Sequence, residues 1–528
     1  MYKVLVSDKL AEEGLAVLRE SKEFQVDVRT DLKGDTLRDA IGEYDALLVR
    51  SATKVTKDII EAADKLKVIG RAGVGLDNVD LDAATAKGVI VMNTPAGNTI
   101  STAEHTMSMI LALARSIPQA NSSLKSGEWK RSKFMGVELY NKVLGIVGLG
   151  RIGAEVAKRA LSFGMKLLAY DPFLKVEVAQ SIGVEVVELK ELLERSDYIT
   201  VHTPLSDETR HMISDEEFET MKKGVRIINC ARGGVIDEKA LARAVQSGKV
   251  TGAAVDVFEK EPVSSDNELL SLPQVVTTPH LGASTEEAQV NVAVEVALIV
   301  RDALLGKGIR NAANYPCLEA EVCKVMEPYL TLAERLGIFS SQLAEGRLCE
   351  LNITYSGEII QQDVTPLTLA LVKGVLTPIL KETVNSINAL ALAKERGIQI
   401  SESRSSQEQE FVTLMQLEIK TDKETKKVAG TLSANKQPRI VKVDEYYVEA
   451  TPAGVMIYLK NLDVPGIIGN LGSLMGEHNI NIAGMTFGRD RPGGTAISVL
   501  NVDSPVSAEL LDQIRKVENI HYVKAIKV

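Results

Sequence analysis

The glycine-rich hexapeptide GLGRIG, residues 148–153, constrains the fold of this chain more than any other feature. It follows the apolar run KVLGIV and opens RIGAEVAKRAL, which has helical spacing. Between a strand and a helix, the first glycine permits a tight turn, the second lets backbone approach a pyrophosphate, and the third allows close helix–sheet packing. Free N–H groups at the helix N-terminus then face the phosphates. The hexapeptide therefore predicts a Rossmann-type dinucleotide-binding sheet.

A carboxylate ends the next predicted strand of this unit. Asp171 closes the stretch MKLLAYD, where a carboxylate accepts hydrogen bonds from the ribose hydroxyls and repels a 2′-phosphate. NAD is therefore predicted over NADP, although Lys175 lies close enough to weaken that preference.

Apolar runs alternate with amphipathic stretches on both sides of the hexapeptide. YKVLVS, YDALLVR and LKVIGR precede it, and YITVHTP, VRIINC and QVVTTP follow it. Such alternation is typical of βαβ units with parallel sheets. After about residue 316 the pattern changes to longer strands with one polar face, mixed with helices. From about residue 451 the order is βαββαβ, which is ferredoxin-like.

Composition excludes several classes of protein. Hydrophobic residues make up 45% of the 528 residues and charged residues 25%, which is ordinary for a globular protein. The net charge of -10 disfavours a nucleic-acid partner. No stretch approaches the roughly 20 apolar residues of a membrane span, and no signal peptide is visible. The four cysteines, Cys230, Cys317, Cys323 and Cys349, form no CxxC pair, so we expect reduced thiols, no metal site and a cytoplasmic protein.

Three later loops carry side chains suited to oxidising a hydroxy acid. They are residues 229–234 (NCARGG), 256–262 (DVFEKEP) and 278–284 (TPHLGAS), each following a predicted strand. Ligands of such sheets bind beyond the carboxyl ends of the strands. The oxidation needs a base for the hydroxyl proton, a carboxylate that orients the base, and a cation for the substrate carboxylate. His280, Glu261 and Arg232 supply these groups. Elsewhere, His105 is interpreted as a packed core residue and His202 as structural.

The hexapeptide and the three loops together resemble the D-isomer-specific 2-hydroxyacid dehydrogenase family, in which they occur in this order. The resemblance implies that His280 is the acid/base, Glu261 its partner and Arg232 the substrate and cofactor clamp. The cofactor-binding residues that it implies are Gly148, Gly150, Arg151, Ile152, Gly153, Asp171, Thr203, Pro204, Cys230, Ala231, Asp256, Gly282 and Ala283.

The stretches VRSATKVT, GRAGVGLDNVD and NTPAGNTISTAEH extend the resemblance to long members of the family that act on 3-phosphoglycerate. The implied reaction is NAD-dependent oxidation of 3-phosphoglycerate to 3-phosphohydroxypyruvate, the first step of serine biosynthesis. The implied substrate-binding residues are Arg50, Ser51, Arg71, Gly73, Trp129, Arg131 and Lys133. Residues 129–133 would reach the active site of a neighbouring subunit in a dimer or homotetramer. The alternatives for this segment are a dimer anchor and a solvated face.

The resemblance also implies a division of the chain. Residues 1–97 and 284–315 would form a flavodoxin-like substrate-binding domain around an NAD-binding domain of residues 98–283. An intervening regulatory domain (316–450) and an ACT domain (451–528) would follow. ACT domains bind small amino acids at a paired interface, which makes L-serine the expected effector. The matching effector-binding positions are Asn461, Asp463 and Asn481, with a dimerisation module that senses nothing as the alternative.

Two other functions remain open. One is a dehydrogenase for glyoxylate or a malate-like acid, which Arg50, Arg71 and the long C-terminal extension disfavour. The other is a non-catalytic NAD sensor similar to the C-terminal-binding corepressors. The presence of all three groups needed for oxidation disfavours the sensor.

Overall fold

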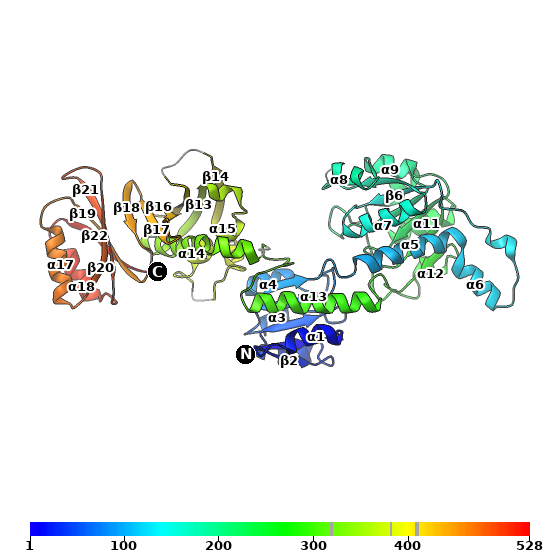
Figure 1. The fold of residues 1–528 in the computed structure, drawn as a ribbon, viewed down its shortest axis with the longest axis horizontal. Coiled ribbons are helices and arrows are strands. Elements are labelled where there is room, and N and C mark those ends of the chain that lie inside the picture. Colours follow the sequence, from blue (N-terminus) through cyan, green and yellow to red (C-terminus); the bar gives the residue numbers. More distant parts are fainter. Residues whose placement is uncertain (175, 317–319, 381–382, 407–410) are drawn as a thin grey trace.

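Four β-sheets follow one another along the chain in the computed structural model (Figure 1). The structure describes residues 1–528 except 175, 317–319, 381–382 and 407–410, so Cys317 lies outside the described residues. Two parallel α/β sheets come first, a mixed sheet third and an antiparallel sheet last. The predicted fold class is confirmed.

The first sheet forms what we call the N-terminal lobe. Its five parallel strands have the order β2-β1-β3-β4-β5, which is the flavodoxin-like order. Both faces are covered by helices, because its strands are apolar on both sides. The strands are β1 (Tyr2–Val6), β2 (Phe24–Val28), β3 (Ala46–Val49), β4 (Val68–Arg71) and β5 (Ile90–Asn93). The helices are α1 (Glu12–Arg19), α2 (Asp35–Ala40), η1 (Ile41–Glu43), α3 (Lys57–Glu61), α4 (Leu81–Lys87) and, from much later in the sequence, α13 (Glu286–Leu304).

The second sheet forms the cofactor lobe. Its seven parallel strands have the order β12-β11-β10-β9-β6-β7-β8, so the order in which strands are added to the sheet reverses between β6 and β9, as in Rossmann sheets. The strands are β6 (Val143–Val147), β7 (Lys166–Tyr170), β8 (Glu185–Val186), β9 (Tyr198–Val201), β10 (Val225–Asn229), β11 (Val250–Val255) and β12 (Val275–Thr277). The helices are α5 (Thr99–Arg115), α6 (Ile117–Lys125), η2 (Arg131–Phe134), α7 (Arg151–Ser162), α8 (Val176–Ser181), α9 (Leu189–Arg195), α10 (Asp215–Thr220), α11 (Glu238–Gln246) and α12 (Glu268–Ser271).

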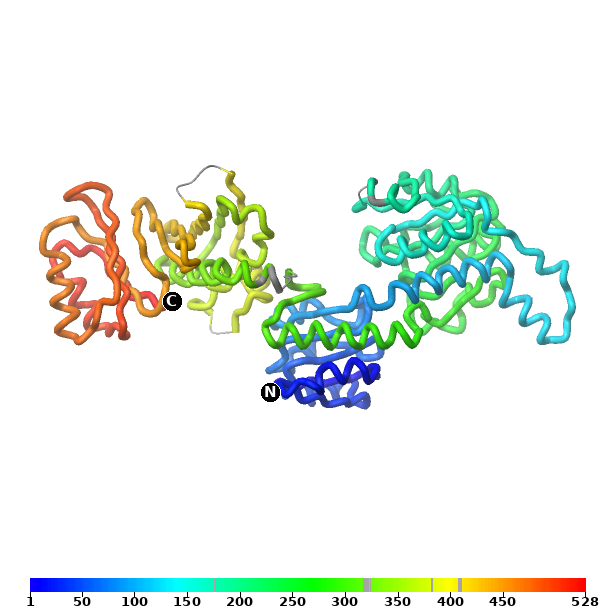
Figure 2. The backbone as a smooth tube through the Cα atoms, viewed as in Figure 1, coloured from blue at the N-terminus to red at the C-terminus, as the bar shows by residue number. Residues whose placement is uncertain are grey.

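The backbone passes between the two lobes twice, before α5 and before α13 (Figure 2). The two passages lie against each other, since the hydroxyls of Ser101 and Thr102 donate hydrogen bonds to the carbonyl of Gly282. The lobes are therefore joined at one narrow hinge.

The third sheet is mixed and has helices on one face. Its strand order is β14-β13-β15-β16-β17-β18, and only β13 and β14 run parallel. The elements are α14 (Ala320–Leu343), β13 (Leu348–Gly357), η3 (Glu358–Gln361), α15 (Thr365–Leu376), α16 (Ala389–Glu395), β14 (Gln399–Ser405), β15 (Thr413–Thr421), β16 (Thr425–Leu432), β17 (Pro438–Val443) and β18 (Tyr446–Ala450). The side-chain amide of Asn385, next to α16, donates to the carbonyl of Gly88 at 2.8 Å, which ties this region to the N-terminal lobe.

The C-terminal module has the predicted βαββαβ order. Its sheet order, β20-β21-β19-β22, is the ferredoxin-like one, with both helices on one face. Its elements are β19 (Val455–Leu462), α17 (Ile467–Glu477), β20 (Ile482–Arg489), β21 (Thr495–Val502), α18 (Ala508–Lys516) and β22 (Ile520–Lys527).

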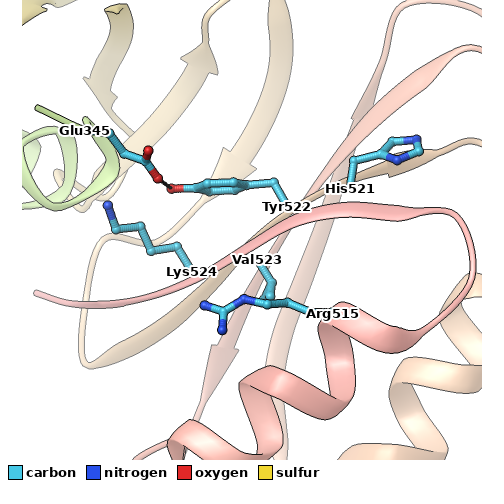
Figure 3. A pocket seen from close by; sticks show the side chains of 6 residues that line it. All are labelled: Glu345, Arg515, His521, Tyr522, Val523 and Lys524. Carbon is cyan, nitrogen blue, oxygen red and sulfur yellow. Dashed lines mark hydrogen bonds between the residues drawn. The ribbon is translucent and has the colours of Figure 1, made fainter. Parts of the chain in front are cut away.

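The other face of the C-terminal sheet packs on the mixed-sheet region. Met456, Tyr458 and Ile526 belong to the same apolar core as Leu336 and Phe339 of α14. At the rim of this junction, the hydroxyl of Tyr522 donates to Glu345 at 3.1 Å beside a shallow cleft of about 250 Å³ (Figure 3). The two regions thus share one core.

Among the described residues, none of the helices is both long and apolar enough to cross a bilayer.

Candidate active site

A cleft of about 380 Å³ opens between the two lobes. The carboxyl ends of strands from both parallel sheets meet there, as the strand order predicts. The residues that line it are Val74, Gly75, Leu76, Asp77, Asn98, Thr102, Ile152, His202, Thr203, Pro204, Leu205, Cys230, Ala231, Arg232, His280, Gly282 and Ala283.

The glycine hexapeptide has the geometry that a pyrophosphate requires. Gly148 has a φ of 92°, which glycine adopts without strain. A Cβ on Gly153 would lie 2.2 Å from the carbonyl oxygen of Gly148, so only glycine lets α7 start this close to the turn. A Cβ on Gly150 would meet no atom within 4 Å, and this open space faces the N-terminus of α7. The residues present therefore fit a dinucleotide.

The other predicted cofactor positions surround this turn. Asp171 accepts a hydrogen bond from the N–H of Leu149 at 2.9 Å, which places its carboxylate beside the glycine turn. Seven of the predicted cofactor residues line the cleft: Ile152, Thr203, Pro204, Cys230, Ala231, Gly282 and Ala283. Burial raises the pKa of the Cys230 thiol to about 12, so this cysteine stays protonated and acts as an apolar wall.

His280 and Glu261 form the predicted pair. Nδ1 of His280 lies 2.8 Å from Oε2 of Glu261, and the N–H of Phe258 donates to the other oxygen at 3.1 Å. Burial opposes ionisation of Glu261, but the hydrogen bonds from His280 and Phe258 hold its pKa below the usual value. Because the ionised carboxylate accepts a hydrogen bond from Nδ1–H of His280, the lone pair of the neutral imidazole is on Nε2.

Asp256 holds the loop that carries His280. Its fully buried carboxylate accepts the N–H groups of Leu281 (2.7 Å) and Gly282 (2.9 Å) and the hydroxyl of Thr278 (2.5 Å). Nε2 of His105, which the sequence predicts to be a packed core residue, lies 3.2 Å from the same carboxylate, and its side chain is 18% exposed. Asp256, predicted to bind the cofactor, is thus behind the cleft wall in this structure, where it supports the loop.

The cations converge on the cleft from both lobes. The guanidinium of Arg232, which is 28% exposed, lies with Nε 3.7 Å from Oδ2 of Asp77. Nε of Arg71 is buried and has no hydrogen-bond partner. Burial, reinforced by the positive charge of Arg232, lowers the pKa of Arg71 to about 10. Arg50 does not line the cleft, and its guanidinium donates a hydrogen bond to the carbonyl of Lys9.

Besides Arg50, four predicted substrate residues lie outside the cleft of their own chain. Ser51 is exposed next to Arg50. Trp129 is 77% exposed, and Arg131 and Lys133 are exposed in η2, on an arm that projects from the cofactor lobe beyond α6 (Figure 1). Gly73 remains near the cleft, since its N–H donates to the hydroxyl of Thr94 and it adjoins Val74.

The three predicted effector positions have different partners in the structure. Asn461 is buried and donates to the carbonyl of Leu462. Asp463 accepts a hydrogen bond from the guanidinium of Arg489 at 2.9 Å. The amide of Asn481 donates to Asp503 at 2.6 Å.

Sequence reasoning missed several residues that line the cleft, among them Asp77, Asn98 and Leu205. Asp77 adjoins the glycine-rich turn after β4, and the glycines of that turn are the sequence signal that could have indicated its place in the cleft. His202 also lines the cleft; burial lowers its pKa to about 4, which makes it a neutral wall residue and agrees with the structural interpretation.

Comparisons with known proteins assign the parts of the chain. Residues 107–282 match the NAD binding domain of D-isomer specific 2-hydroxyacid dehydrogenases, which confirms NAD as the cofactor. Residues 325–444 match the intervening domain of D-3-phosphoglycerate dehydrogenase, and residues 455–519 match the ACT domain.

Relatives and solved structures agree with these matches. The chain is 46% identical over 529 residues to D-3-phosphoglycerate dehydrogenase of Methanocaldococcus jannaschii, covering 100% of both chains. It is 45% identical over 526 residues to that of Bacillus subtilis, covering 100% of this chain and 99% of the relative. A D-lactate dehydrogenase from Aquifex aeolicus, solved with NAD and lactic acid, has a TM-score of 0.52 and 32% identity over 58% of this chain and 96% of its own. The full-length likeness and the three matched domains place this chain in the D-3-phosphoglycerate dehydrogenase family.

Proposed function

We propose that the protein oxidises 3-phospho-D-glycerate to 3-phosphohydroxypyruvate with NAD, as the first step of L-serine biosynthesis, under feedback control by L-serine. The observation that carries the proposal is the His280–Glu261 pair at 2.8 Å, facing a cleft that Arg71 and Arg232 also approach. A hydroxy acid with a second anionic group suits this arrangement, because it needs one base and more than one cation.

The chain's own residues supply the acid–base chemistry. Nε2 of His280 accepts the proton of the substrate hydroxyl, and Glu261 stabilises the resulting imidazolium through Nδ1. Arg232 holds the substrate carboxylate with its guanidinium. The glycine turn at Gly148 to Gly153 would hold NAD, which would supply the acceptor for the hydride from C2 of the substrate.

Arg71 is assigned to the substrate phosphate. Its buried Nε lacks a partner, and an arginine held in that state offers strong hydrogen bonds to an incoming anion. We expect Arg71→Met to raise KM for 3-phosphoglycerate roughly tenfold, since a hydrogen bond to a charged group contributes about 1.5 kcal/mol. Steady-state kinetics with NAD should show a much smaller rise for unphosphorylated D-glycerate.

An equal rise for both substrates would assign Arg71 to another role. Wild-type enzyme that binds NAD but turns over neither acid would instead support the NAD-sensor alternative. Turnover of glyoxylate or a malate-like acid in preference to 3-phosphoglycerate would favour the other dehydrogenase.

A homo-oligomer, either a dimer or a homotetramer, is part of the proposal. Large apolar side chains are exposed on α6 and on the arm beyond it, at Ile117, Leu124, Trp129, Met135 and Tyr140. Apolar surface of this kind favours a second subunit, whose active site would receive Trp129, Arg131 and Lys133. Cytoplasmic location is also proposed; in support, Cys230 and Cys349, whose side chains the structure describes, are free thiols.

The proposal includes these residue roles and a division into a substrate-binding, an NAD-binding, an intervening and an ACT domain. In support of the division, the first sheet is built from residues 2–93 and the second from residues 143–277, while α13 returns to the first lobe.

L-Serine is expected to lower the rate at millimolar concentration, and Asp463→Asn is expected to weaken this inhibition. The carboxylate of Asp463 is suited to an effector ammonium group, although Arg489 holds it in this structure. Titrating L-serine into the assay of wild type, Asp463→Asn and the control Asp490→Asn tests this. A wild-type rate that does not respond to serine would leave the ACT domain as an assembly element.

A further inference from the structure

We propose that Asp77 is an internal counter-ion of the substrate site: its carboxylate pairs with Arg232 across the cleft and is displaced when an anionic substrate binds. The inference deepens the proposed function and rests on it for the identity of the substrate.

The ion pair joins the two lobes. Asp77 lies in the turn after β4 of the N-terminal lobe, whereas Arg232 lies in the loop after β10 of the cofactor lobe. A Cβ added to Gly75 would lie 2.5 Å from a terminal nitrogen of Arg232 and 2.6 Å from Oδ2 of Asp77. The absence of a side chain at Gly75 is therefore what allows the guanidinium to reach the turn.

Both partners are anchored through their neighbours. The amide of Asn78 donates to the carbonyls of Arg50 and Thr53 at 2.6 Å, which fixes the turn that carries Asp77. The amide of Asn229 donates to the carbonyl of Arg232 at 2.9 Å. The contact thus follows from two fixed pieces of backbone.

Charge explains why a carboxylate is present at an anion site. Arg71 and Arg232 repel each other, while Asp77 attracts Arg71 as well as Arg232. Among the described residues that line the cleft, Asp77 alone is acidic. It therefore offsets the repulsion between the two guanidinium groups while the cleft holds no anion.

The same contact is weak enough to be displaced. The side chain of Asp77 is 72% exposed, and the distance of 3.7 Å exceeds that of a hydrogen bond. Exposed ion pairs contribute little, whereas a substrate carboxylate can bind the guanidinium through two hydrogen bonds. Once the substrate is bound, Asp77 becomes a like charge beside it. Asp77 therefore lowers the affinity of the cleft for every anion.

Asp77→Asn tests this, because it removes the charge and keeps the shape. We expect KM for 3-phosphoglycerate to fall about two- to fivefold, the range typical of an exposed ion pair, with kcat unchanged within about twofold. Asp77→Glu keeps the charge, so its KM should stay closer to that of wild type than the KM of Asp77→Asn does. Asp82→Asn, in the exposed first turn of α4, removes the same charge outside the cleft and should leave KM unchanged.

A second measurement does not depend on turnover. Inorganic phosphate should raise the Tm of Asp77→Asn more than that of wild type, since phosphate no longer competes with the carboxylate. A KM that is unchanged or higher, or equal phosphate shifts in Tm, would overturn the role of Asp77. Absence of wild-type turnover of 3-phosphoglycerate would contradict the proposed function alone, because the phosphate comparison tests Asp77 independently.

Discussion

Replacing His280 by alanine is expected to lower kcat for 3-phosphoglycerate by about 10²- to 10⁴-fold, the usual contribution of a positioned acid–base group. Nε2 of the imidazole is the acceptor for the hydroxyl proton, and alanine leaves that proton without a base. NADH should still bind, because His280 is not part of the glycine turn that opens α7. Stopped-flow or steady-state kinetics and NADH fluorescence titration measure the two effects.

The chain offers a matched control in His211. This histidine also has a left-handed backbone and also pairs with a glutamate, Glu259, at 3.0 Å, but it does not line the cleft. His211→Ala should therefore retain most of the activity. Equal losses in both variants would show that folding of the loops, and not proton transfer, had been disturbed.

Arg232→Ala is expected to lower kcat/KM by roughly 10²- to 10³-fold, since removing one partner of a desolvated charge pair costs about 3–4 kcal/mol. Arg232→Lys should recover only part of this loss, because an ammonium group cannot bind a carboxylate through two parallel N–H groups. Steady-state kinetics of both variants with 3-phosphoglycerate and NAD provide the measurement.

Arg243→Lys serves as the control for the arginine-to-lysine change, since Arg243 is exposed on α11 and pairs with Asp215. It should keep wild-type kinetics. Full activity of Arg232→Lys would mean that a point charge is sufficient and that bidentate binding is not used.

Local patterns were enough to predict the sheets and the central pair of the site. The hexapeptide between a strand and a helix predicted the Rossmann order because its glycines have position-specific backbone roles, seen here at Gly148 and Gly153. Strand-end loops predicted that His280, Glu261 and Arg232 lie at the same edge of one sheet. These predictions depend on secondary structure and on the order of its elements, which short stretches of sequence are enough to indicate.

The rest depends on contacts between distant segments. Nothing in the helical spacing of α5 indicates that Ser101, Thr102 and His105 support the loop of His280. Their partners in that loop, Gly282 and Thr278, are 173 to 181 residues away in the sequence. Asp77 was missed for the same reason, because its partner Arg232 belongs to the other lobe. Periodicity predicts which face of a helix is apolar but not which loop the polar residues meet.

The core shared by the ACT sheet and the mixed-sheet region has a consequence for how regulation is studied. Deleting the chain after residue 450 would remove Met456, Tyr458, Ile497 and Ile526 from the core that α14 completes. The truncated enzyme would expose apolar surface that is buried in the full chain. A change in its kinetics would then reflect disrupted packing and not the loss of an effector site. The ACT domain is therefore not an independent folding unit in this chain, and single surface substitutions in it are the sound way to test the proposed regulation.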